Sequence, residues 1–297
     1  MKKTGSGSTL WFAAIVLCMI ASMFALFFAS CKKVGTSSPD DGLNVEHEDL
    51  SGLKPEDGDD PYSPDAPGEN GGPEVPSGGT GGPSAGTGPV RLGETEDAGR
   101  EYLDKLVFLG DSTTYGIGYY YDRGFPELVP PSQVWTPASG TLTLAYHATA
   151  TIVYPETGEE ILIRDAVERA KPEYLVITLG VNGISFMDEA WFVRDYTSLV
   201  EMVKAASPET KIILNSIYPV TATYPYQKDI NNDKIRTANG WIEQIAADTG
   251  VRFLYSFESV ADENGNLPED STNDEGLHLT GEAFTKVMAY IRTHEYR

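Results

Sequence analysis

The stretch Leu106-Val-Phe-Leu-Gly-Asp-Ser-Thr-Thr114 joins a run of apolar residues directly to a polar turn. A short and nearly continuous run of Val, Leu and Phe is typical of a parallel strand covered by helices on both faces. The glycine and aspartate after it favour a tight turn. The sequence therefore predicts a buried strand over Leu106–Leu109 that presents Ser112 just beyond its carboxyl end.

Apolar runs of the same kind recur along the rest of the chain. They lie at Tyr174–Leu179, Lys211–Ile217 and Val251–Leu254, with a shorter one near Gln133–Trp135. Helical patterns lie between or after them, at Asp165–Lys171, Asp188–Ala206, Asn231–Thr249 and Gly281–Thr293. This alternation predicts βαβ units, and hence a three-layer α/β/α sandwich around a mostly parallel five-stranded sheet. Residues 141–163 are predicted to form an inserted β-hairpin.

Composition divides the 297 residues into three parts. Residues 1–30 combine a basic start with a long apolar run, the pattern of a signal peptide or a membrane anchor. Residues 31–100 are rich in acidic residues, Gly, Pro and Ser, which predicts a disordered linker. Residues 101–297 alternate apolar and polar segments, as a single folded domain does.

The two cysteines, Cys18 and Cys31, lie in or beside the apolar N-terminal segment. The predicted domain therefore has no disulfide and no thiol nucleophile. Ala29-Ser30-Cys31 resembles the lipobox of bacterial lipoproteins, which implies a lipid on Cys31, and an uncleaved anchor is the alternative. Both interpretations place the domain on the outer face of the cytoplasmic membrane.

The formal net charge of the chain is −22. Such a surface repels polyanions, which argues against a nucleic-acid partner. The sequence contains no ligand-spaced pair such as His-x-x-x-His, so neither a metal nor another cofactor is predicted.

Three polar segments follow predicted strands or precede the last helix. They are Gly110-Asp111-Ser112-Thr113, Gly180-Val181-Asn182-Gly183 and Glu275-Gly276-Leu277-His278. Each alone is an ordinary turn, but in an open α/β sheet the ligand site lies outside the carboxyl ends of the strands. Together they offer a hydroxyl nucleophile, an amide donor and an imidazole base, the groups that acyl transfer needs.

The same segments resemble the sequence blocks of the SGNH/GDSL hydrolases, a family with a flavodoxin-like fold. Leu106–Thr114 is similar to the first block, Gly180-Val-Asn182 to the Gly-x-Asn block, and Glu275-Gly-Leu-His278 to the final Asp-x-x-His block. The blocks occur in the family's order across nearly the whole predicted domain. The resemblance implies a serine hydrolase that acts on esters.

The resemblance also implies roles for single residues. Ser112 is the expected nucleophile, and His278 is the expected general base and acid. Asn182 and the backbone N–H of Ser112 are expected to bind the oxyanion, with Gly140 as the candidate for the glycine that the family adds. Asp111 is expected to be structural and to bond local backbone.

One position departs from the family pattern. The residue three places before His278 is Glu275 instead of aspartate, and Asp274 is its neighbour. We expect Glu275 to orient the imidazole, with Asp274 as the alternative and a Ser–His dyad if neither carboxylate reaches it.

Aromatic residues near the predicted loops suit stacking on sugar faces; they are Tyr115, Tyr119, Tyr120, Tyr121, Trp135, Tyr218, Tyr224 and Tyr226. We therefore expect an extracellular esterase that removes short acyl groups, acetyl in particular, from a carbohydrate or cell-wall glycan. The alternatives are a lipase, lysophospholipase or thioesterase, an acyltransferase, and a non-catalytic surface-binding protein with the same fold.

Overall fold

The computed structural model describes residues 90–297. The predicted signal or anchor segment, Cys31 and most of the predicted linker lie outside the described residues. Within residues 90–297, no helix combines the length and the hydropathy that crossing a membrane requires.

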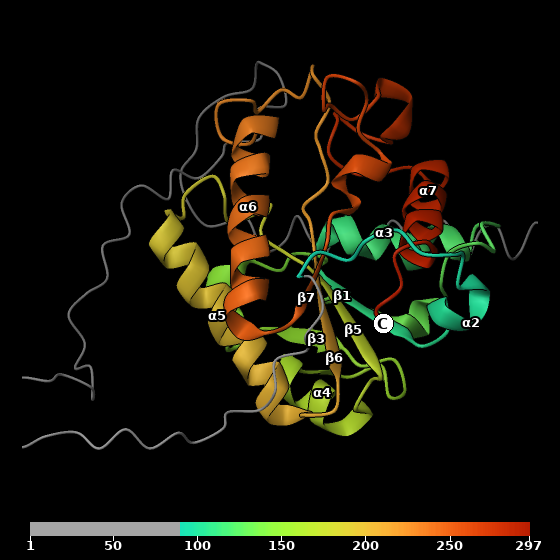
Figure 1. Ribbon diagram of the computed structural model, residues 1–297, viewed down its shortest axis with the longest axis vertical. Helices are drawn as coiled ribbons and strands as arrows, with labels where there is room; N and C mark the ends of the chain where they lie inside the picture. The colour runs from blue at the N-terminus through green and yellow to red at the C-terminus, as the bar shows by residue number, and fades with distance from the viewer. Residues whose placement is uncertain (1–89) are drawn as a thin grey trace, which may run out of the picture. The chain divides into compact units, whose positions relative to one another are not determined.

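A parallel five-stranded sheet forms the centre of the domain (Figure 1). Its strands are β1 (Leu106–Gly110), β2 (Val134–Trp135), β5 (Tyr174–Thr178), β6 (Lys211–Asn215) and β7 (Arg252–Leu254). They lie in the order β2-β1-β5-β6-β7, and every neighbouring pair is parallel. The predicted α/β sandwich and its five strands are therefore confirmed.

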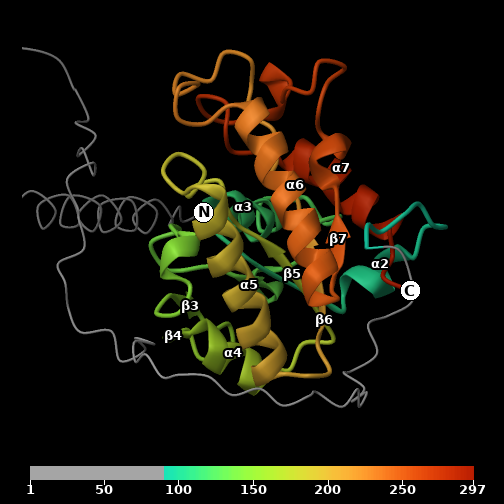
Figure 2. The same ribbon diagram turned by 60° about the vertical axis from the view of Figure 1, so that its left-hand side comes forward.

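Helices cover both faces of the sheet (Figures 1 and 2). One face carries α4 (Ile163–Ala170), α5 (Glu189–Ala206) and α6 (Asn232–Thr249), and the other carries α2 (Gly99–Leu103), α3 (Ser112–Tyr121) and α7 (Gly281–Arg292). Alternate strand residues point to opposite faces. In β1, Leu109 packs into the first core, whereas Phe108 packs into the second.

Capping residues mark where the long helices begin and end. Asp188 accepts a hydrogen bond from the backbone N–H of Trp191 at the start of α5, and Thr280 accepts one from Ala283 at the start of α7. Gly250 ends α6 with φ of 70°, a left-handed conformation that favours glycine.

The inserted hairpin is shorter than the predicted range 141–163. Its strands, β3 (Thr151–Val153) and β4 (Glu160–Leu162), form a separate antiparallel pair. A 3₁₀ turn over Leu144–Tyr146 precedes them. The hairpin prediction is confirmed for residues 151–162.

The predicted start of the domain at residue 101 lies too late in the chain. The N–H of Leu92 donates to the carbonyl of Phe253 (2.8 Å), and the carbonyl of Val90 accepts from the N–H of Phe253 (2.9 Å). Ala98 also bonds to Arg292 through its N–H (2.9 Å). Residues 90–98 therefore belong to the folded domain, because they pair with the free edge of β7 and with the end of α7.

Candidate active site

The junction between β1 and α3 presents Ser112. Strand β1 ends at Gly110 and α3 begins at Ser112, so the chain turns within one residue. A Cβ on Gly110 would lie 2.0 Å from Oγ1 of Thr114 and 2.7 Å from the carbonyl oxygen of Thr178. Only glycine fits there, because helix and neighbouring strand approach it closely.

Asp111 caps the helix that carries Ser112. Its Oδ1 accepts hydrogen bonds from the backbone N–H (2.9 Å) and the hydroxyl (2.7 Å) of Thr113. The predicted bonding of Asp111 to local backbone is thus observed. Burial raises the pKa of Asp111 to about 6, against the opposing effect of the two hydrogen bonds from Thr113.

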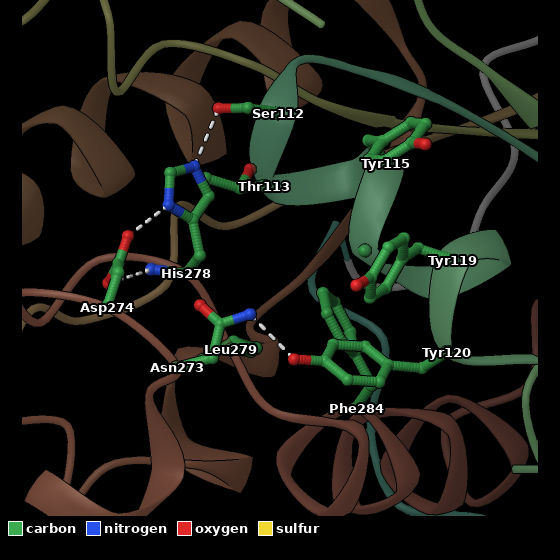
Figure 3. A pocket seen from close by; sticks show the side chains of 11 residues that line it. Ser112, Thr113, Tyr115, Tyr119, Tyr120, Asn273, Asp274, His278, Leu279 and Phe284 are labelled. Carbon is green, nitrogen blue, oxygen red and sulfur yellow. Dashed lines mark hydrogen bonds and ion pairs between the residues drawn. The ribbon is translucent and has the colours of Figure 1, made fainter. Parts of the chain in front are cut away.

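His278 lies against Ser112 (Figure 3). Its Nε2 is 2.9 Å from Oγ of Ser112, and its Nδ1 is hydrogen-bonded to Oδ2 of Asp274. Because a carboxylate accepts the proton on Nδ1, Nε2 is left to accept the hydroxyl proton of Ser112. The three side chains form one continuous chain of hydrogen bonds from a carboxylate to a hydroxyl.

The expectation that Glu275 orients the imidazole is wrong, and the alternative, Asp274, takes that place. Oδ1 of Asp274 accepts the backbone N–H groups of Gly276 (3.0 Å) and Leu277 (3.0 Å), so the carboxylate folds over its own turn toward His278. Glu275 is exposed and, within residues 90–297, its carboxylate has no hydrogen bond or ion pair.

The surroundings of Asp274 keep its carboxylate charged. Burial alone would raise its pKa, but hydrogen bonds from the His278 ring, from the N–H of Leu277 and from the Thr272 hydroxyl outweigh burial and hold the pKa well below its usual range. A charged carboxylate at this place stabilises a protonated imidazole.

Asn182 reaches the site from the loop after β5. Its Nδ2 donates to Oδ2 of Asp111 (3.3 Å) and to the carbonyl of Leu142 (3.1 Å). The structure therefore brings Asn182 beside the turn that carries Ser112, with both amide hydrogens engaged. At the first position of α3, the N–H of Ser112 has no hydrogen-bond partner among the described residues.

Gly140 does not offer the expected oxyanion donor. Its N–H donates to the carbonyl of Pro137 (2.9 Å), and its φ of 73° is that of a tight turn. The backbone group of this loop that reaches the site is instead the carbonyl of Leu142, bonded to Asn182. The Gly140 prediction is wrong because the turn uses that N–H internally.

A cavity of about 320 Å³ opens beside Ser112 and His278. Tyr115, Tyr119 and Tyr120 of α3 line it, together with Asn273 from the loop that carries Asp274 (Figure 3). Sequence reasoning missed both α3 and Asn273. The i, i+4 spacing of Tyr115 and Tyr119 could have indicated the helix, whereas no sequence signal marks Asn273.

One comparison with known proteins identifies a family. The model of the GDSL-like lipase/acylhydrolase family matches residues 108–284. No curated protein gives a significant match.

Several solved structures have a similar fold. A GDSL-like lipase from Bacteroides thetaiotaomicron is 23% identical over 62% of this chain and 83% of its own, with a TM-score of 0.44. The periplasmic domain of a lipopolysaccharide acetyltransferase from Salmonella ser. Paratyphi A is 14% identical over 67% and 82% (TM-score 0.42). A carbohydrate esterase family 3 protein from Talaromyces cellulolyticus is 16% identical over 62% and 92% (TM-score 0.40).

Proposed function

The chain belongs to the GDSL-like lipase/acylhydrolase family, and from this premise we propose that it is a serine esterase that removes short acyl groups, acetyl in particular, from a carbohydrate. The observation that carries the proposal is the hydrogen-bonded chain Ser112–His278–Asp274 beside an open cavity.

Acylation begins at the Ser112 hydroxyl. His278 takes its proton through Nε2 while Oγ attacks the ester carbonyl, and Asp274 stabilises the imidazolium that forms. His278 then gives the proton to the leaving alcohol oxygen as the carbon–oxygen bond breaks. A water molecule, activated by the same imidazole, releases the acyl group as a carboxylic acid and restores Ser112.

The oxyanion that forms at the ester carbonyl needs hydrogen-bond donors beside Ser112. The N–H of Ser112 lies at the N-terminus of α3, where helix dipole and open donor both favour negative charge. Asn182 supplies a second donor by exchanging its 3.1 Å hydrogen bond to the Leu142 carbonyl for one to the oxyanion.

The cavity lining supports an ester with a polar alcohol. Tyr115, Tyr119, Tyr120 and Asn273 line the cavity beside Ser112, together with the apolar residues Leu279 and Phe284. A long acyl chain would need an extended apolar channel to leave water favourably.

An activity-based probe and a set of esters test the proposal. A fluorophosphonate should label the wild type and His294→Ala, a control whose imidazole stacks on Tyr290, but neither Ser112→Ala nor His278→Ala. Among 4-nitrophenyl esters, acetate should give the highest kcat/KM.

Highest activity on long acyl chains would indicate a lipase instead, and capture of the acyl group by added sugar would indicate an acyltransferase. A folded wild type that is not labelled would support the surface-binding alternative.

We also propose that the domain works outside the cytoplasmic membrane, tethered by a lipid on Cys31 or by the uncleaved apolar segment. The support is the order of basic start, apolar run and Ala29-Ser30-Cys31. The mass of the N-terminal peptide, extracted from membranes, distinguishes the two tethers, and recovery of the intact protein from cytosol would contradict both.

A further inference from the structure

Two cavities flank a pair of tyrosines on α3. The first, of about 320 Å³, contains Ser112 and His278, and the second, of about 560 Å³, lies between α3 and the segments around β2 and β3. Tyr115 and Tyr119 line both cavities. We call these two residues the tyrosine ridge.

The tyrosine ridge is exposed yet well supported. Tyr115 is 52% exposed and Tyr119 is 37% exposed, so neither ring is a core residue. Tyr119 packs edge-on against Tyr120, with ring centroids 5.2 Å apart, and the guanidinium of Arg123 lies 3.4 Å from the centre of the Tyr119 ring. Exposed rings held in place by their neighbours are typical of a binding surface, because little motion is lost when a ligand arrives.

The chemistry of the site decides which part of the substrate meets this ridge. His278 must protonate the leaving alcohol, so the alcohol portion of the ester lies on the His278 side of Ser112. The first cavity is on that side, since His278 and the tyrosine ridge line it together. The ridge therefore faces the alcohol and not the acyl group.

The groups of the second cavity suit an uncharged sugar. Asp122 and Arg123 bring opposite charges, and Ser132 and Thr136 bring hydroxyls, so hydroxyl groups of a ligand find both donors and acceptors. The electron-rich faces of the tyrosines suit the C–H face of a sugar ring. The chain's net charge of −22 opposes a polyanionic ligand.

We propose that the substrate is an acylated, uncharged polysaccharide whose chain crosses the tyrosine ridge. This rests on the proposed function and specifies its substrate. The acylated unit lies in the first cavity and neighbouring units lie in the second. Tyr119 is seven residues beyond Ser112, about 10 Å along the helix axis, so a unit that stacks on Tyr119 neighbours the acylated unit.

The test compares substrates of increasing length. Acetate release from partially O-acetylated xylo-oligosaccharides, monomer to hexamer, should show kcat/KM rising about tenfold from monomer to tetramer. Tyr115→Ala and Tyr119→Ala should each remove most of this rise, while Tyr115→Trp keeps it. Tyr146→Ala is the matched control, because Tyr146 is 67% exposed and lines neither cavity. Partially acetylated polygalacturonate should be a poorer substrate than acetylated xylan.

Two results would overturn the proposal. One is an equal kcat/KM for monomer and hexamer in the wild type, and the other is a rise in kcat/KM with substrate length that is unchanged in both alanine variants. A preference for polygalacturonate would also overturn it. Retardation of Ser112→Ala in gels that contain acetylated xylan measures binding without turnover. If the enzyme hydrolyses small esters but its kcat/KM does not depend on substrate length, the esterase proposal holds and the polysaccharide proposal fails. If retardation depends on Tyr119 but no ester is hydrolysed, the tyrosine ridge binds polysaccharide and the esterase proposal fails.

Discussion

The hydroxyl of Tyr120 accepts a 2.6 Å hydrogen bond from Nδ2 of Asn273 (Figure 3). This bond joins α3, which begins at Ser112, to the loop that carries Asp274 and His278. The ring of Tyr120 also packs edge-on against Phe125, with centroids 5.7 Å apart, so its position does not depend on the hydroxyl alone. The bond thus fixes the loop relative to the helix.

Tyr120→Phe keeps the ring and removes this bond. We expect kcat to fall about tenfold with a smaller change in KM, because a looser loop spends less time with Nε2 beside Oγ. The acidic limb of the pH–kcat profile should move as well, which a purely structural loss of stability would not cause. Steady-state kinetics across pH provide the measurement. The control is Tyr121→Phe, since the Tyr121 hydroxyl has no hydrogen bond within residues 90–297.

The neighbouring acids Asp274 and Glu275 give a matched pair of variants. Asp274→Asn should lower kcat about 10³-fold or more, because the amide loses the charge that stabilises the imidazolium. Glu275→Gln should leave kcat within about twofold of the wild type, since its carboxylate is exposed and unbonded within the described residues. Hydrolysis of 4-nitrophenyl acetate measures both. A larger loss from Glu275→Gln than from Asp274→Asn would contradict the observed geometry.

The sheet could be predicted from the sequence because its strands are short apolar runs. One of them, Tyr174–Thr178, is buried along its whole length. The pairing of Ser112 with His278 could also be anticipated, since both residues lie in segments that are expected at the carboxyl edge of a parallel sheet. Helix α3 was missed because its glycines and tyrosines hide the apolar spacing of an ordinary amphipathic helix.

The orienting acid could not be predicted because backbone geometry selects it. Gly276 has φ of 117°, and this turn places Asp274, four residues before His278, next to Nδ1. The spacing in the sequence favoured Glu275, one residue later. Gly140 failed for a similar reason, because a local turn determines where its N–H points.

Asn182→Ala separates a role in catalysis from a role in folding. Loss of an oxyanion donor should lower kcat about 10²-fold to 10³-fold with little change in KM. The same change leaves the Leu142 carbonyl and Oδ2 of Asp111 without their donor, so the free energy of unfolding should fall by about 1–3 kcal/mol. Urea denaturation alongside kinetics measures both effects. A loss of stability with unchanged kcat would limit Asn182 to a structural role.

Asp111 should make the stability of the domain depend on pH between about 4 and about 6. Its pKa is about 6 in the fold, compared with an ordinary value of 3.8. The folded protein therefore holds a proton that the unfolded chain has released, and stability falls as pH rises through this window. The total change should approach roughly 3 kcal/mol, since one pKa unit corresponds to about 1.4 kcal/mol.

Comparison of Asp111→Asn with the wild type isolates this contribution, because the other titrating groups are common to both proteins. Asp274 contributes to the pH dependence of stability with the opposite sign. Its lowered pKa adds stability that is lost only as pH falls below the usual aspartate range. Because both proteins contain Asp274, its contribution cancels when their free energies of unfolding are subtracted. Urea denaturation from about pH 4 to about pH 7 should show the wild type losing stability relative to the variant as pH rises. A difference that stays constant with pH would mean that Asp111 titrates in the fold as it does in the unfolded chain.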